Sequence, residues 1–328
     1  MPTPSEANTR GDDLSPAIGA VDLTAHSHRR PRSVFGNYLS GGERDPQDGP
    51  LSEPHAVQKL ASPIDHEPAG LQAGIDAAMA RSFAYQLLAR AFEDPSSVSW
   101  SWLVFANTHN ALFAAVGALA GCAADLTEAE AALNKQLANA DLESFRTAYV
   151  TAFGHAARGD CPLNEIEYGD LKADPLFQPH RLADLAAFYR AFDLEVAPIA
   201  AERPDHICMQ LEFMSFLTAK EAYGREHQMD HETIALCRDA QKKFLREHLG
   251  RWSPAFARRL ARVATDPALA AVAEFTRRFI SAECAQFQLL AGSEDLLLRP
   301  VDEAAESLCA SCGLKDGPPG ASHGGPTI

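Results

Sequence analysis

Hydrophobic positions in the central part of the chain recur at helical spacing. Met79, Phe83 and Leu87 are four residues apart, which places them on one face of a helix and predicts that this face lies in the core. Pro95 is expected to end this first helix, predicted over 75–92. The same pattern predicts further helices over 98–120, 127–153, 179–192, 204–226, 231–249, 254–263 and 267–290.

Two details refine this helical prediction. The most apolar window, 98–120, contains polar side chains around His109 that would be costly in a bilayer, so we expect a buried helix of a soluble protein. Thr127, followed three residues later by Glu130, has the spacing of a capping box and is expected to start the next helix. Alternating strands with tight Asn-Gly or Asp-Gly turns are missing. The sequence therefore predicts an all-α fold.

Composition divides the chain into three parts. Residues 1–70 hold nine Pro and seven Gly, whereas residues 71–300 hold nine of each over more than three times the length. A segment so poor in apolar periodicity cannot offset the entropy of ordering it. We therefore expect a disordered leader over 1–70, a helical domain over 71–300 and a flexible tail over 301–328.

Charge and cysteine content narrow the function classes. The chain has 29 Lys and Arg against 44 Asp and Glu, a formal net charge of −15, which argues against a nucleic-acid partner. Seven Cys without a secretory leader favour reduced thiols in the cytoplasm. Phosphate-binding loops, dinucleotide fingerprints and hydrolase motifs are missing, so a nucleotide hydrolase ranks last among the hypotheses.

A metal site is the alternative hypothesis. Cys309 and Cys312 form a CxxC in the predicted tail, but a four-cysteine site needs a second such pair. His227 and His231 are four residues apart and could share a metal on one helix face. Their charged surroundings favour a solvated surface. A helical metal-binding or redox-sensing protein that uses either pair is therefore the second choice.

Two segments between the helices, 161–169 and 196–206, are rich in residues with special chemistry. Pro204 and Asp205 can start a helix, with Asp205 as its cap and His206 kept neutral by the helix dipole in the first turn. Glu165 and Glu167, next to Tyr168, could instead accept a guanidinium in a bidentate ion pair. An ordinary acidic loop and a ligand-binding loop both remain open on this chemistry.

The same segments resemble a known family. Residues 202–214, Glu-Arg-Pro-Asp-His followed by Ile-Cys-Met-Gln-Leu-Glu-Phe-Met, resemble the signature of the TorD/DmsD/NarJ family of cytoplasmic molybdoenzyme chaperones. Residues 85–92, 161–168 and 182–192 resemble further stretches of that family in the expected order. The form of the 161–169 loop resembles the branch that serves enzymes of the dimethyl sulfoxide reductase superfamily. The combination covers about residues 75–290.

This resemblance implies a single all-helical domain of two closely joined halves with a hinge near 195–205. It implies a dedicated chaperone that binds the twin-arginine signal peptide and the apo form of a molybdoenzyme catalytic subunit, assists insertion of the molybdopterin cofactor and delays export. Molybdenum cofactor biosynthesis proteins are further implied partners, whereas catalysis, a cofactor of its own, nucleic acid and stable membrane association are not expected. The implied signal-peptide and client-binding residues are Glu202, Pro204, Asp205 and His206, with Glu165, Glu167 and Tyr168 as further candidates.

Overall fold

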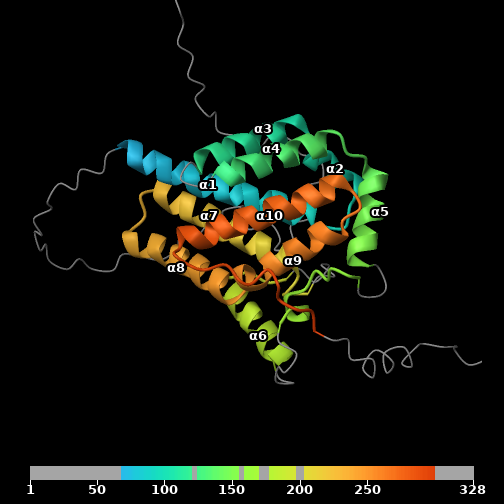
Figure 1. The fold of residues 1–328 in the computed structure, drawn as a ribbon. Coiled ribbons are helices and arrows are strands. Elements are labelled where there is room, and N and C mark those ends of the chain that lie inside the picture. The colour runs from blue at the N-terminus through green and yellow to red at the C-terminus, as the bar shows by residue number, and fades with distance from the viewer. Residues whose placement is uncertain (1–67, 120–123, 155–158, 170–176, 197–202, 300–328) are drawn as a thin grey trace, which may run out of the picture. The chain divides into compact units, whose positions relative to one another are not determined.

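The computed structural model describes residues 68–119, 124–154, 159–169, 177–196 and 203–299, which all belong to one compact unit (Figure 1). The helices are α1 (Pro68–Ala91), α2 (Ser97–Leu103), α3 (Ala106–Ala118), α4 (Ala124–Ala138), α5 (Leu142–Phe153), α6 (Phe177–Arg190), α7 (Ile207–Glu226), α8 (His231–Glu247), α9 (Leu249–Val263) and α10 (Pro267–Gln286), with a 3-10 turn, η1, at Glu165–Glu167. Two isolated bridges and no strand occur among the described residues, which confirms the all-α fold. The predicted tail, residues 1–67 of the predicted leader and residues 197–202 of the predicted hinge lie outside the described residues.

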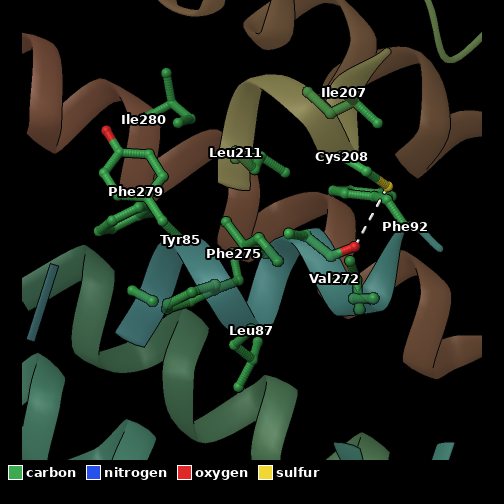
Figure 2. Packing of buried hydrophobic residues seen from close by; sticks show 14 of the residues in the cluster. Tyr85, Leu87, Phe92, Ile207, Cys208, Leu211, Val272, Phe275, Phe279 and Ile280 are labelled. Carbon is green, nitrogen blue, oxygen red and sulfur yellow. Dashed lines mark hydrogen bonds between the residues drawn. The ribbon is translucent and has the colours of Figure 1, made fainter. Parts of the chain in front are cut away.

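Helix α1 forms the centre of the bundle. It packs most extensively against α7 and also contacts α3 and α10. Figure 2 shows Tyr85 of α1 beside Phe279 of α10, and their ring centroids are 4.8 Å apart. The thiol of Cys208 on α7 donates to the backbone carbonyl of Ala89 on α1. A fully buried large apolar side chain contributes about 1.5–3 kcal/mol, so these contacts hold the three helices together. Met79 was wrongly predicted to face the core, because its side chain is 47% exposed.

The apolar window 98–120 forms two helices rather than one. A reciprocal capping box between Ser96 and Ser99 starts α2, and extended backbone at Phe105 separates α2 from α3. Val98, Phe105 and Phe113 are more than half exposed, so the prediction of one buried helix was wrong. High apolar content alone does not show which side of a helix the core covers.

The predicted capping box at Thr127 was also wrong. Thr127 lies inside α4, and Glu130 accepts a hydrogen bond from Asn134 one turn further on. The predicted helix over 127–153 is divided at Asp141, whose side chain accepts from the backbone N–H groups of the first turn of α5. The stronger cap at Asp141 therefore sets the start of the second helix.

Pro254 lies within α9, although the sequence predicted a helix that begins there. A proline has no N–H to donate to the carbonyl of the residue four positions earlier, here Gly250. The backbone N–H of Gly292 donates to that carbonyl instead, over 2.8 Å. A Cβ on Gly292 would lie 1.9 Å from the carbonyl oxygen of Arg251, so only glycine permits this approach. The segment after α10 thus completes the hydrogen bonding of α9.

A buried ion-pair network joins the four helices α1, α7, α8 and α10. The Arg81 guanidinium of α1 donates to Glu283 of α10 over 2.8 and 3.0 Å, to Glu221 of α7 and to Gln241 of α8. The phenol of Tyr85 also donates to Glu283, over 2.8 Å. Because these charged groups are almost completely buried, each carboxylate depends on its partners for stability.

Candidate functional site

The two segments singled out in the sequence lie side by side. The backbone N–H of Glu165 donates to the carbonyl of Asp205 over 3.0 Å, and the N–H of Ile207 donates to the carbonyl of Leu163 over 2.9 Å. An isolated antiparallel bridge forms between Asn164 and His206. The loop before η1 is therefore joined to the segment that starts α7.

The other end of the same loop contacts the end of the described chain. Gly169 donates to the carbonyl of Leu297 over 3.0 Å, and Arg299 donates to the carbonyl of Glu167 over 2.8 Å. Tyr168 forms a bridge with Leu298. Segments near residues 165, 205 and 298, far apart in sequence, thus meet at one place.

Glu165 is the charged centre of this place, and its carboxylate is fully buried. One oxygen, Oε1, accepts from the guanidiniums of Arg181 on α6 and Arg251 on α9, the latter over 3.2 Å. The other oxygen, Oε2, accepts from the amide of Gln210 over 2.7 Å and lies 3.2 Å from Nδ1 of His248. Side chains from α6, α7, α9 and the residue between α8 and α9 therefore converge on one carboxylate.

These partners determine the charge of Glu165. Burial, the largest influence, raises the pKa of Glu165, but the hydrogen bond and charge of His248 and the charges of Arg181 and Arg251 together lower it to about 2. The carboxylate is therefore ionised at neutral pH. An ionised carboxylate makes strong charge-assisted hydrogen bonds to guanidinium groups, here those of Arg181 and Arg251.

Asp205 has a different position from the one predicted. His206, not Asp205, is the N-cap of α7, and its Nδ1 accepts from the N–H of Cys208 over 3.2 Å. The fully buried carboxylate of Asp205 accepts from the N–H of Ile166 over 3.2 Å and pairs with Arg203 over 3.0 Å. Burial raises the pKa of Asp205, and Arg203 and the Ile166 N–H only partly oppose this. Asp205 therefore holds η1 in place instead of capping α7, which begins two residues later, at Ile207.

His206 is buried and neutral. Burial, and then the charge of Arg203, lower its pKa to about 4. A neutral ring can accept the N–H of Cys208 at Nδ1, as an N-cap requires. The predicted neutral state of His206 therefore follows from burial rather than from the helix dipole.

The remaining predicted site residues surround this core. The carbonyl of Pro204 accepts from the phenol of Tyr189 on α6 over 2.7 Å. Tyr168 is fully buried against Trp252 and donates to the carbonyl of Pro162 over 2.9 Å. Glu167 is partly buried beside it, and Glu202 lies outside the described residues. The structure thus brings six of the seven predicted residues together, with the carboxylates of Glu165 and Asp205 turned inward.

Sequence reasoning missed the partners of Glu165. His248 directly precedes α9, and Arg251 and Trp252 follow it by three and four residues, the spacing of neighbours on one side of a helix. Trp252 donates to the side-chain oxygen of Gln210 over 3.0 Å, which orients the Gln210 amide toward Glu165. The spacing was visible in the sequence, but nothing there linked it to a carboxylate more than eighty residues earlier.

The alternative metal site gains no support from the described part of the chain. His227 ends α7 with its ring stacked on Tyr223, and His231 begins α8 as an exposed residue. No group of three or more His, Cys, Asp or Glu side chains that could hold a metal occurs among the described residues. Cys309 and Cys312 lie outside them. Within the same residues, no helix is both long and apolar enough to cross a membrane.

Comparison with known proteins finds one family model and several relatives that are similar to this chain. Residues 119–258 match a protein-family model described as nitrate reductase delta subunit. The chain is 28% identical to the perchlorate reductase assembly chaperone protein of Dechloromonas aromatica over 214 residues, which are 63% of this chain and 90% of the relative.

Two shorter matches point in the same direction. The selenate reductase assembly chaperone protein of Thauera selenatis is 38% identical over 89 residues, 27% of this chain and 44% of the relative. The chlorate reductase assembly chaperone protein of Ideonella dechloratans is 34% identical over 79 residues, 24% of this chain and 39% of the relative. These two alignments span less than half of each relative. Together with the all-helical fold, these matches support the predicted resemblance to the TorD/DmsD/NarJ family of molybdoenzyme maturation chaperones.

Proposed function

We propose that this protein is a maturation chaperone for the catalytic subunit of a molybdenum-dependent reductase. The support is that three relatives are named assembly chaperones of selenate, perchlorate and chlorate reductases. In this proposal the protein works by binding and release and catalyses no reaction.

The client segment that we propose is the twin-arginine signal peptide of the apo subunit. The chaperone would bind the peptide in the cytoplasm before export and shield it until the molybdopterin cofactor is inserted. Cofactor biosynthesis proteins would bind this complex in the cytoplasm. The observation that carries this proposal is the carboxylate of Glu165, which already accepts two guanidiniums, from Arg181 and Arg251. A chain of net charge −15 also attracts a basic peptide at long range.

The predicted site residues take different parts in this proposal. Glu165 is the receptor for a guanidinium. Asp205 and His206 are positioning residues, because they hold η1 and the start of α7 that carry the receptor. Pro204 and Glu167, which are partly buried, border the surface around the receptor, and the fully buried Tyr168 packs beneath it. Glu202 remains a proposed contact by the family resemblance alone.

Purification from the native host tests this proposal. A tagged copy of the chain should retain a reductase catalytic subunit whose N-terminus carries two adjacent arginines, identified by mass spectrometry. A labelled peptide of that N-terminus should bind the chain in solution, and binding should weaken as salt rises because a charged contact is screened. The matched control is the same peptide with both arginines replaced by glutamine. Equal binding of the two peptides, or retention of the subunit without its N-terminal segment, would contradict the signal-peptide proposal.

A further inference from the structure

Helix α6 differs from the other helices in how it is held. No other helix of the described chain packs closely against its backbone, and long side chains bridge the gap instead. In Figure 1, α6 lies at the edge of the bundle, beside α8. Its attachment therefore depends on a small number of identifiable side-chain contacts.

The apolar side of α6 rests on an aromatic surface formed by α7, α8 and His248, the residue after α8. Phe188 packs edge-on against Phe244, at 5.3 Å between ring centroids, and against the ring of His248 at the same distance. Tyr189 lies 5.0 Å from Phe213 of α7, and Leu185 is fully buried. The surface beneath α6 thus accepts one apolar side of a helix.

The N-terminal part of α6 makes the polar contacts. Arg181 donates to the carboxylate of Glu165 and to the backbone carbonyl of Glu247. One turn later, Asp184 places Oδ2 3.2 Å from Nε2 of His248. In chain order, α6 therefore presents an arginine to Glu165 and then an apolar helical face to the aromatic surface.

A twin-arginine signal peptide has the same order of chemistry, a basic n-region followed by an apolar stretch of about 7–15 residues. We propose that α6 is an internal stand-in for the client's signal peptide, and that the peptide binds by displacing α6 from Glu165 and from the aromatic surface of Phe213, Phe244 and His248. This inference rests on the proposed function and deepens it. The second guanidinium on Glu165, that of Arg251, lies 3.2 Å from the carboxylate and shows that the receptor accommodates two such groups at once.

Competition between α6 and the peptide has a measurable consequence. When the binding-competent form is only a fraction of the molecules, the apparent dissociation constant rises by the inverse of that fraction. Removing the Arg181 contact while keeping the surface intact should increase the fraction in which α6 is displaced. The free energy of a hydrogen bond to a charged group, here that of Arg181 to Glu165, is large enough that its loss should increase this fraction about tenfold. A weaker α6 contact should therefore give tighter peptide binding.

The test compares Arg181→Gln with Arg190→Gln. Arg190 lies in the last turn of the same helix, is exposed, and makes none of the Glu165 contacts, so its loss removes the same charge from α6. The probe is a fluorescein-labelled synthetic peptide with two adjacent arginines followed by an apolar, helix-forming segment of about 15 residues. Arg181→Gln should bind this peptide about tenfold more tightly than wild type, and Arg190→Gln should bind it like wild type.

Hydrogen exchange on the wild-type protein provides a second readout that does not depend on a variant. Saturation with the arginine peptide should increase amide exchange over residues 181–190 of α6, while exchange in α7 stays unchanged or decreases. Unchanged exchange in α6 despite binding would overturn the displacement and leave signal-peptide binding intact at another place. The displacement would also be overturned if Arg181→Gln bound the arginine peptide no more tightly than Arg190→Gln does. Failure of the arginine peptide to bind any of the three proteins, or binding equal to that of a glutamine version, would contradict both this inference and the proposed function.

Discussion

Replacement of Glu165 by glutamine tests the central electrostatic feature of the site. Glutamine has nearly the same shape, but it offers one acceptor oxygen where the carboxylate offers two. Its NH2 group would also face donors, among them the guanidiniums of Arg181 and Arg251. The substitution therefore removes a charge and introduces unsatisfied donors without creating a cavity.

The size of the effect follows from the pKa of Glu165. The pKa lies at about 2 in the folded chain and at 4.5 without these partners. At about 1.4 kcal/mol for each pH unit, this difference corresponds to about 3 kcal/mol of stabilisation of the ionised folded form. Loss of one member of a buried ion pair costs about 3–5 kcal/mol. We expect Glu165→Gln to lower the free energy of unfolding by about 3–5 kcal/mol at pH 7.

Urea denaturation measures this loss, with Glu128→Gln as the control because Glu128 is exposed on α4. Folding lowers the pKa of Glu165, so its stabilisation is complete above pH 4.5 and disappears as the pH falls through about 2. The difference between wild type and Glu165→Gln should therefore shrink by about 1 kcal/mol between pH 7 and pH 3.5. A variant as stable as Glu128→Gln at pH 7, or a difference that does not shrink in acid, would refute this reasoning.

Three further predictions concern stability, each measured by urea denaturation. Arg81→Met should lower the free energy of unfolding by about 3–5 kcal/mol, because it leaves Glu283 buried without its cation; a loss below about 1 kcal/mol would contradict this. The free energy of unfolding of the wild type should fall by about 3 kcal/mol as the pH falls from 6.5 to about 4, because unfolding lets His206 bind a proton that burial excludes. His206→Gln should lack this loss, and a variant with the same pH profile as wild type would exclude His206 as its source. Tyr168→Phe should lower the free energy of unfolding by about 1–2 kcal/mol, because the buried carbonyl of Pro162 loses its donor. An unchanged free energy of unfolding would show that another donor replaces the phenol.

Local patterns in the sequence determined much of the secondary structure of the described residues. Apolar residues at three- and four-residue spacing predicted α6, α7, α8 and α10 to within about four residues of their ends, because one buried face of a helix repeats every 3.6 residues. They also predicted the end of α1, which begins seven residues before the predicted start at residue 75. The termini were less certain where several caps compete, as in the segment that Asp141 divides. The start of α7 is another example, since His206 rather than Asp205 is its cap.

The arrangement of the site was decided by tertiary structure. The sequence marked Glu165 and Asp205 as residues with special chemistry, and the family resemblance suggested that they work together. It could not show that Glu165 is fully buried, because that burial is provided by Arg181, Gln210 and His248 from distant helices. Hydrogen-bond partners so far apart in the chain leave no local pattern, whereas the charge that they stabilise depends entirely on their being brought together.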